Sequence, residues 1–125
     1  MPLAEATHPP KEAVIAKALL SAAGRLGVSA KELSRVVGVS ETALSRLKSD
    51  PRLAGRLSDK SCELALLFIR LYRSLDVILG GDDAAARRWM RAANAAFGSA
   101  PLDRIRTIDG LAHVLAYLDD RRAPL

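Results

Sequence analysis

The sequence predicts an all-helical protein, on the basis of three observations. Half of the 125 residues are hydrophobic, and alanine and leucine dominate among them. Runs of β-branched residues and strict polar–apolar alternation, which are typical of strands, are absent. Apolar residues instead recur every three or four positions, and Ser, Gly and Pro stand where these segments begin and end. A chain of this length can bury one or two small cores, so we expect no more than two compact helical units.

Residues 1–10 contain three prolines and show no periodicity, so a flexible tail is expected there. The first helix is expected from Lys11 to Gly24 or Arg25, and Gly27 ends the segment. Its expected buried side consists of Val14, Ala18, Leu19 and Ala22, with Leu26 closing over it.

Residues 30–48 carry the pattern of two short helices joined by a tight turn. Ser29 can cap the first helix, and Glu32 completes a capping box. Gly38 stands where that helix must end in a left-handed conformation, which a residue without a Cβ adopts without strain. Ser40 can cap the second helix. The apolar residues of the inner faces and the turn are Leu33, Val36, Val37, Val39, Leu44 and Leu47. This is the helix-turn-helix pattern, which is typical of DNA-binding proteins and also occurs as plain packing in small helical domains.

The second helix of this pattern carries polar side chains on its outer face. Thr42, Ser45 and Arg46 are the candidate base contacts, because the N-terminal half of a recognition helix enters the major groove. A guanidinium such as that of Arg46 can donate two hydrogen bonds to guanine. The candidate phosphate contacts are Lys31, Lys48 and Arg52.

The distribution of charge supports this interpretation. The formal net charge is +5 at pH 7. Residues 1–56 hold nine Lys and Arg against five Asp and Glu, whereas the rest of the chain holds ten against nine. The positive field therefore lies on the helix-turn-helix half, as contact with phosphates requires. Ordinary solvated surface charge would also give an excess of this size.

The second half of the chain begins with a long apolar helix. Residues 53–57 are expected to add one more turn to the first unit, which spans residues 11–57. Ser58 can cap a helix that runs to about Leu79, and Gly80 ends it. Its apolar residues extend over more than one face, so we expect both units and a second copy of the chain to cover it, making a homodimer. Those residues are Leu64, Leu66, Leu67, Ile69, Leu71, Tyr72, Leu75, Ile78 and Leu79.

Three further helical segments are expected in residues 84–125. The first runs from Ala84 to about Phe97 and ends at Gly98, a short one begins at Pro101, and the last runs from Ile108 to about Leu118 with Thr107 as its cap. The expected buried residues are Ala86, Trp89, Met90, Ala93, Phe97, Leu111, Val114, Leu115 and Leu118. Residues 119–125 are expected to form a mobile charged tail.

The residue types needed for catalysis or metal binding are scarce. The single cysteine, Cys62, cannot form an internal disulfide, which is typical of a reducing cytosol. His8 and His113 lack further ligands at metal-binding spacing, and no phosphate-binding loop is present. The sequence therefore predicts no enzymatic activity, no metal and no cofactor. No secretory signal or membrane-spanning run is apparent, so a cytoplasmic location is expected.

The stretch from residue 88 reads RWMRAANAAFGSAPLDRIRTIDGLAHVLAYL. A Trp is followed by an Asn, a glycine, a Pro-Leu turn, and then a Thr and a Gly that open the last helix. The residues of this pattern are Trp89, Asn94, Phe97, Gly98, Pro101, Leu102, Thr107 and Gly110. It resembles the toxin-binding domain of the Xre/MbcA/ParS antitoxins, and the helix-turn-helix resembles the Xre family, with Ser34 where that family usually has alanine. The ending DDRRAPL departs from the Ile-x-x-Gly-like ending of the family.

The resemblance implies an antitoxin of a bacterial type II toxin–antitoxin system, with a DNA-binding domain at residues 11–57 and a toxin-binding domain at residues 58–125. Such a protein binds a RES-domain toxin that consumes NAD, covers its active site and represses its own operon. The candidate toxin contacts are Arg87, Arg91, Arg104, Arg106, His113, Tyr117, Arg121 and Arg122. We expect the last helix and the tail, including Arg121 and Arg122, to cover the NAD site, because guanidinium groups bind carboxylates and pyrophosphate in bidentate fashion. A solubilising charge cluster is the alternative role of these two arginines.

Two other functions fit the same sequence. One is a stand-alone helix-turn-helix regulator whose C-terminal half serves only dimerisation. The other is a protein-interaction module whose helix-turn-helix does not bind DNA.

Overall fold

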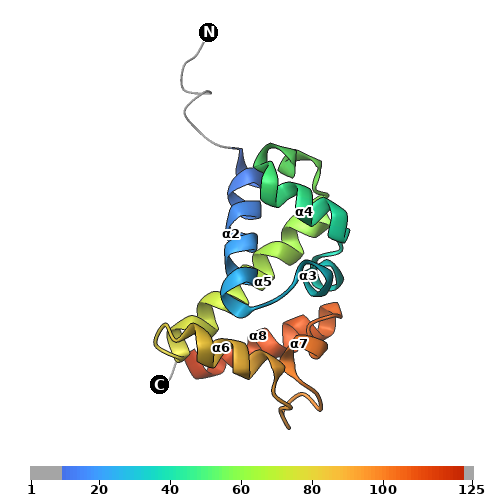
Figure 1. Ribbon diagram of the computed structural model, residues 1–125. Coiled ribbons are helices and arrows are strands. Elements are labelled where there is room, and N and C mark those ends of the chain that lie inside the picture. Colours follow the sequence, from blue (N-terminus) through green and yellow to red (C-terminus); the bar gives the residue numbers. More distant parts are fainter. Residues whose placement is uncertain (1–9, 123–125) are drawn as a thin grey trace.

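The computed structural model describes residues 10–122 of the chain. These residues form a helical fold, and their only β-type pairing is an isolated bridge between Asn94 and Ser99, so the all-helical prediction is confirmed. The elements are α2 (Lys11–Leu26), α3 (Ala30–Val37), α4 (Glu41–Ser49), the 3₁₀ helix η1 (Pro51–Arg56), α5 (Asp59–Ile78), α6 (Asp83–Arg91), α7 (Pro101–Arg104) and α8 (Ile108–Arg122). Figure 1 shows an N-terminal unit above a C-terminal unit, with α5 running through both.

The N-terminal unit contains the predicted helix-turn-helix. The Oγ atom of Ser29 accepts from the Glu32 N–H at 3.1 Å, and Glu32 Oε1 accepts from the Ser29 N–H at 3.0 Å, which forms the capping box. Gly38 ends α3 at φ +69°, and Ser40 caps α4 by accepting from the Ala43 N–H at 3.1 Å. The inner residues of both helices are buried against α2 and α5, namely Leu33, Val36, Val37, Leu44 and Leu47.

Helix α5 is shared by the two units. It packs against α2 and α3 on the N-terminal side and against α8 on the C-terminal side. Its most deeply buried large side chains are Phe68, Leu71 and Leu75, each at most 1% exposed. Because one continuous helix contributes to both cores, the orientation of the two units depends on α5.

The C-terminal unit has a small core between α5, α6, α7 and α8. Its buried side chains are Met90, Ile105, Leu111, Val114 and Leu118. Thr107 Oγ1 accepts from the Gly110 N–H at 3.1 Å at the start of α8, as the sequence predicts. A Cβ at Gly110 would lie 1.8 Å from the carbonyl oxygen of Arg104, so glycine is what allows α8 to start this close to the end of α7.

The predicted helix 84–97 is too long, because α6 ends at Arg91. The reason is Asn94, whose side chain bonds the nearby backbone and so competes with helical hydrogen bonds. Its Oδ1 accepts from the Ala96 N–H at 3.0 Å, and its carbonyl oxygen accepts from the N–H groups of Phe97 and Gly98. Residues 92–100 therefore form a tight loop, and Ala93 is exposed rather than buried.

The predicted end of the last helix at Leu118 is also wrong, because α8 continues to Arg122. Contacts with α5 hold this extra turn in place. Asp119 pairs with Arg70, and Arg122 Nη1 donates to the buried hydroxyl of Ser74 at 3.2 Å. The remainder of the predicted tails, residues 1–9 and 123–125, lies outside the described residues.

Besides Ala93, two residues assigned to buried faces are exposed. Val14 is 52% exposed. The side of α2 that faces the core carries Ile15, Leu19 and Leu26, and Val14 lies at the outer edge of this side. Leu66 of α5 is 47% exposed and faces away from both cores. Trp89 is only partly buried. None of the helices within residues 10–122 has the length and apolarity that crossing a bilayer requires.

Candidate functional site

The first candidate surface is the outer side of α4. Thr42, Ser45 and Arg46 are all exposed there, while Leu44 and Leu47 are buried on the opposite side of the same helix. The buried leucines and the Ser40 cap hold α4 firmly, so the three polar side chains project from a rigid element. This is the geometry that places a recognition helix in the major groove.

The predicted phosphate contacts lie on this helix and on two elements that pack against it, α3 and η1. Lys31 lies at the start of α3, Lys48 in the last turn of α4, and Arg52 in η1, and all three are exposed. Arg52 is bound to Asp50, whose Oδ1 accepts from the Arg52 Nε–H at 3.0 Å. The Arg52 guanidinium lowers the pKa of Asp50, and the Asp50 carboxylate raises the pKa of Arg52. Lys31 and Lys48 form no ion pair with a carboxylate of residues 10–122, so within this part of the chain their charges are available to an incoming anion.

The second candidate surface is centred on α8, and we call it the aromatic surface. It consists of His113, Tyr117 and Arg121 of α8, Trp89 of α6, and the mostly buried ring of Phe97 from the loop between α6 and α7. Trp89 stacks on Tyr117 with ring centroids 6.4 Å apart, and the Phe97 ring meets the Tyr117 ring edge-on at 4.9 Å. His113 meets Phe97 edge-on at 5.2 Å. The Arg121 guanidinium carbon lies 3.5 Å from the centre of the Tyr117 ring, which is a cation–π contact.

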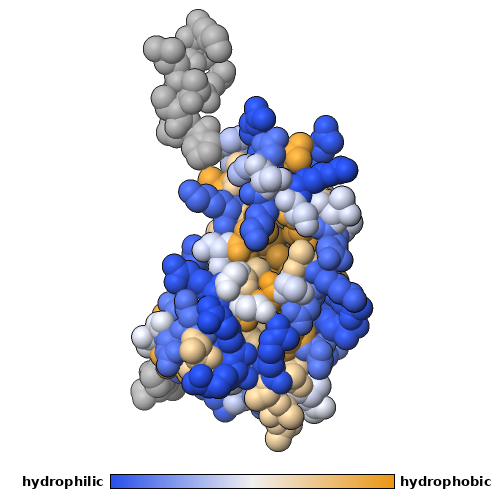
Figure 2. All heavy atoms as spheres, viewed as in Figure 1, coloured by the Kyte–Doolittle hydropathy of each residue, from blue (hydrophilic) through white to orange (hydrophobic). Residues whose placement is uncertain are grey.

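The loop 92–100 extends the aromatic surface. Phe97 anchors the loop against α8, while the alanines around it are exposed. Figure 2 shows weakly hydrophobic atoms at the bottom of the view, where Figure 1 places this loop. The aromatic surface and the loop together offer rings, a cation and small apolar side chains, which are the residue types that protein interfaces favour.

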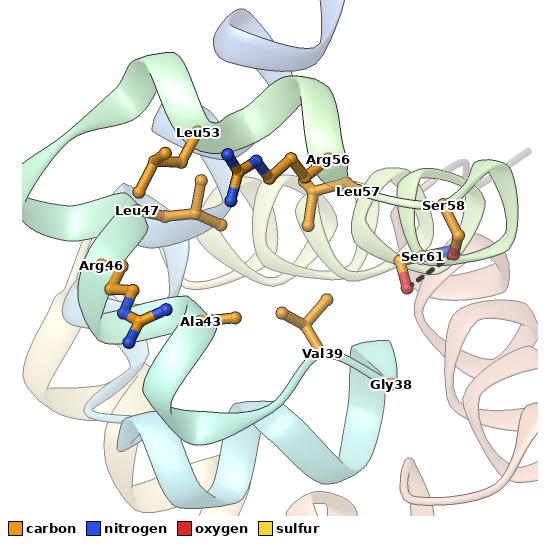
Figure 3. Close-up of a pocket in the computed structure, with 10 residues that line it drawn as sticks. All are labelled: Gly38, Val39, Ala43, Arg46, Leu47, Leu53, Arg56, Leu57, Ser58 and Ser61. Atoms are coloured by element: carbon orange, nitrogen blue, oxygen red, sulfur yellow. Dashed lines mark hydrogen bonds between the residues drawn. The ribbon is translucent and has the colours of Figure 1, made fainter.

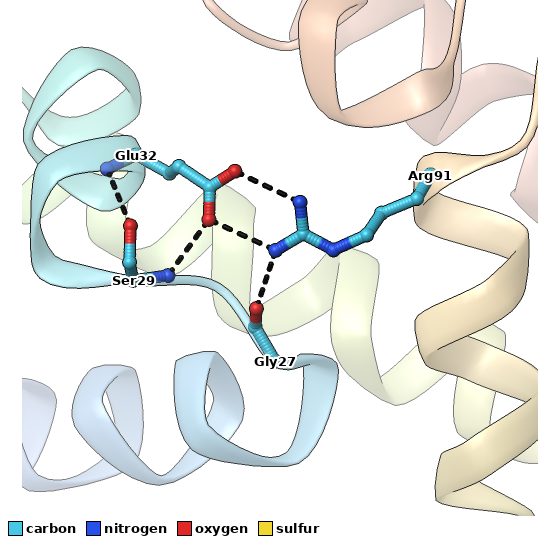
Figure 4. Close-up of polar contacts among 4 residues, drawn as sticks. All are labelled: Gly27, Ser29, Glu32 and Arg91. Atoms are coloured by element: carbon cyan, nitrogen blue, oxygen red, sulfur yellow. Dashed lines mark hydrogen bonds and ion pairs between the residues drawn. The ribbon is translucent and has the colours of Figure 1, made fainter.

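Arg87 and Arg91 of α6 are exposed, but both donate hydrogen bonds to the N-terminal unit. Figure 4 shows the contacts of Arg91. The Nη1 and Nη2 groups of Arg91 donate to the two carboxylate oxygens of Glu32 at 3.0 and 2.9 Å, and Nη2 also donates to the carbonyl oxygen of Gly27 at 2.6 Å. Arg87 Nε donates to the carbonyl oxygen of Arg25 at 3.1 Å. The hydrogen bond from Arg91 is the main cause that lowers the pKa of Glu32 from 4.5 to about 2.

The other predicted toxin contacts are spread over the C-terminal unit. Arg104 is half-buried, with its guanidinium 3.5 Å from Asp109, and Arg122 is bound to Ser74. Arg106 is exposed beside Arg35 in an open depression between α3 and α7. Only His113, Tyr117 and Arg121 are gathered on one face. Within residues 10–122 no cluster of three or more His, Cys, Asp or Glu side chains could hold a metal ion.

Both halves of the chain match known protein families. Residues 9–70 match the antitoxin Xre-like helix-turn-helix domain, and residues 74–123 match the antitoxin Xre/MbcA/ParS C-terminal toxin-binding domain. The chain belongs to the Xre/MbcA/ParS-type antitoxins. The antitoxin therefore combines a helix-turn-helix domain with a toxin-binding domain, as the sequence resemblance implies. No curated protein sequence matches the chain significantly.

The two family matches coincide with the two candidate surfaces. The outer side of α4 lies within the helix-turn-helix match, and the aromatic surface of the antitoxin lies within the toxin-binding match. Arg91 of the toxin-binding match reaches Glu32 of the helix-turn-helix match. The two domains are thus joined by this contact as well as by α5.

The sequence assigns Trp89 and Phe97 to the core, which is confirmed for Phe97, at 8% exposed, whereas Trp89 is only partly buried. The packing of both rings against Tyr117 was not predicted. The signal that could have found it is the spacing of His113, Tyr117 and Arg121, because residues four apart share one face of a helix. The loop 92–100 was not predicted from the sequence, because its alanines taken alone favour a helix.

Proposed function

We propose that this antitoxin neutralises a RES-domain toxin that consumes NAD, by covering the active site of the toxin with its aromatic surface. We propose further that it acts in the cytoplasm and represses its own operon through α4. The observation that carries the first proposal is the gathering of His113, Tyr117 and Arg121 on one exposed face of the toxin-binding domain.

The chemistry of the aromatic surface supports a role in binding a protein. Aromatic and arginine side chains are enriched among the residues that dominate binding energy at interfaces. Tyr117 is held by Trp89, Phe97 and Arg121, so little side-chain entropy is lost when a partner covers it. Arg121 lies beside the ring with no carboxylate partner among the described residues, so it suits an acidic group of the toxin.

The roles of the remaining predicted contacts differ. Arg87 and Arg91 are occupied by internal hydrogen bonds, so we propose that they position α6 and do not touch the toxin. Arg122 is bound to Ser74 and would have to release it in order to enter a NAD site. Arg121 is therefore the stronger candidate of the two terminal arginines.

Operator binding is supported by the exposed polar face of α4 and by the positive charge of the N-terminal half. A homodimer would place two copies of α4 on half-sites one helical turn of DNA apart. Leu66 and Val77, 47% and 58% exposed, lie three turns apart on one side of α5 and are the candidate dimer contacts.

Co-expression with a RES-domain protein encoded beside the antitoxin tests the first proposal. We expect growth to be rescued, NAD levels to be restored and the two proteins to copurify. The double variant Arg121→Ala/Arg122→Ala and, separately, deletion of residues 123–125 then test the C-terminal end. Full rescue by both variants would remove that end from the mechanism, and failure of the unchanged antitoxin to bind any RES protein would leave a regulator whose C-terminal half serves dimerisation.

A further inference from the structure

A cavity of about 360 Å³ lies behind the turn of the helix-turn-helix. Its walls come from the turn, from α4, from η1 and from the first residues of α5 (Figure 3). The lining residues that the argument uses are Val39, Arg46, Leu47, Leu53, Arg56 and Leu57. This volume is within the range of pockets that hold small organic ligands.

Most of the side chains that line this cavity are apolar, and the hydroxyls of Ser58 and Ser61, which bond to each other at 3.1 Å, line one end of it. Val39 and Leu47 are buried beneath it, and Leu53 and Leu57 form the facing wall from η1 and the residue after it. Figure 3 shows these side chains directed toward one common space. Binding of an apolar group there would remove hydrocarbon surface from water on both partners.

The two charged residues that line the cavity are arginines. Arg46 enters from α4 and Arg56 from the last residue of η1, and Figure 3 shows the Arg56 side chain extending toward Leu47. Neither guanidinium forms an ion pair with a carboxylate of residues 10–122, and no Asp or Glu lines the cavity. Arg52, in the same 3₁₀ helix, is instead neutralised by Asp50.

We propose that this cavity binds a small apolar molecule that carries one carboxylate. The apolar part lies against Leu47, Leu53 and Leu57, and the carboxylate accepts hydrogen bonds from Arg56 and Arg46 at the rim. Charge complementarity selects this ligand class, because arginine binds carboxylates in bidentate geometry and none of the described residues that line the cavity is acidic.

Occupation of the cavity has a consequence for DNA, and this step rests on the proposed operator binding. Arg46 is the candidate guanine contact of α4, so a carboxylate that engages it competes with the duplex for the same guanidinium. The ligand would then release the antitoxin from its operator without touching the toxin-binding domain.

Octanoate is a suitable probe, with octan-1-ol as the uncharged control of the same chain length. We expect saturable shifts of the methyl resonances of Val39, Leu47 and Leu53 in the full-length protein with octanoate, and binding about tenfold weaker with octan-1-ol.

Arg56→Gln should weaken octanoate binding by about tenfold. Arg35→Gln, which removes an exposed arginine of α3 outside this cavity, should leave it unchanged. Ala43→Leu, which fills the cavity, should abolish binding while the melting temperature shows that the protein stays folded.

Several results would overturn the proposal. Shifts that do not saturate, equal affinity for octan-1-ol, or unchanged octanoate binding in Arg56→Gln would each exclude a carboxylate site. Loss of operator affinity in Arg56→Gln without any octanoate binding would assign Arg56 to the DNA backbone instead. Octanoate binding that leaves operator affinity unchanged would support the site and overturn only the competition with DNA.

Discussion

Arg91 of α6 and Glu32 of α3 are joined by two parallel hydrogen bonds of 3.0 and 2.9 Å, although they lie 59 residues apart. Glu32 also closes the capping box with Ser29, so one carboxylate both caps the first helix of the helix-turn-helix and binds the toxin-binding domain. A change at Glu32 therefore affects the start of α3 and the domain contact together.

The first prediction concerns the energy of this contact. Arg91→Ala should lower the free energy of unfolding by about 1 kcal/mol, because charged hydrogen bonds are lost but the pair is partly exposed, at 49% and 32%. Chemical denaturation of Arg91→Ala, Glu32→Gln and the double variant gives the coupling free energy, which we expect to be about 1 kcal/mol. Arg88→Ala, at an exposed arginine of the same helix, is the control and should change stability little. A coupling near zero would show that the pair contributes nothing.

The second prediction follows from the pKa of Glu32, which is lowered from 4.5 to about 2. Because the folded pKa lies below the unfolded one, the contribution of Glu32 is fully present above pH 4.5 and is lost as the pH falls toward about 2. The stability difference between the unchanged protein and Glu32→Gln should therefore shrink over this range. Denaturation curves measured at several pH values test it, and a difference independent of pH would contradict it.

The third prediction concerns the close approach of α7 and α8. Gly110→Ala should destabilise the protein by about 2–4 kcal/mol, because the new Cβ would lie 1.8 Å from the carbonyl oxygen of Arg104. Gly24→Ala is the matched control, since no heavy atom lies within 4 Å of its Cβ position in α2. That variant should stabilise the protein by about 0.5–1 kcal/mol through helix propensity. Thermal melts measure both effects. If the melting temperatures of the two variants shifted in the same direction, the proposed clash at Gly110 would be refuted.

The fourth prediction concerns operator binding. Lys48→Ala should weaken binding to all DNA sequences alike, and the slope of the salt dependence should fall by about one counterion. Arg46→Ala should instead weaken binding to the operator by about 1–3 kcal/mol and remove the preference for one base pair. Fluorescence anisotropy across a salt series separates the two effects. Arg73→Ala, at an exposed arginine of α5, is the control. If Arg46→Ala weakened all sequences equally, its assignment to a base edge would be wrong.

Local signals predicted most of the fold. The capping box at Ser29, the left-handed glycine at Gly38 and the cap at Thr107 each depend on a few neighbouring residues, and all are present in the structure. The errors occur where distant residues decide the outcome. Arg70 and Ser74 of α5 extend α8 beyond Leu118, and no property of residues 119–122 alone indicates this.

The candidate sites were predictable to different degrees. Thr42, Ser45 and Arg46 follow from the helix-turn-helix pattern, since its geometry determines which side of α4 faces outward. The engagement of Arg91 by Glu32 could not be predicted, because it depends on how the two domains pack. An arginine that the sequence predicts to contact a partner protein can thus form a contact between two domains of its own chain.

The central claim is that the aromatic surface of α8 binds a RES-domain toxin, and calorimetric titration of the purified toxin tests it most directly. We expect the full-length antitoxin to bind and to block NAD consumption, and the double variant His113→Ala/Arg121→Ala to bind at least about tenfold more weakly. Ile108→Ala is the matched control, because Ile108 is 63% exposed and lies on the opposite side of α8 from Tyr117. Unchanged affinity in the double variant, or no binding of a RES protein by the unchanged antitoxin, would contradict the account.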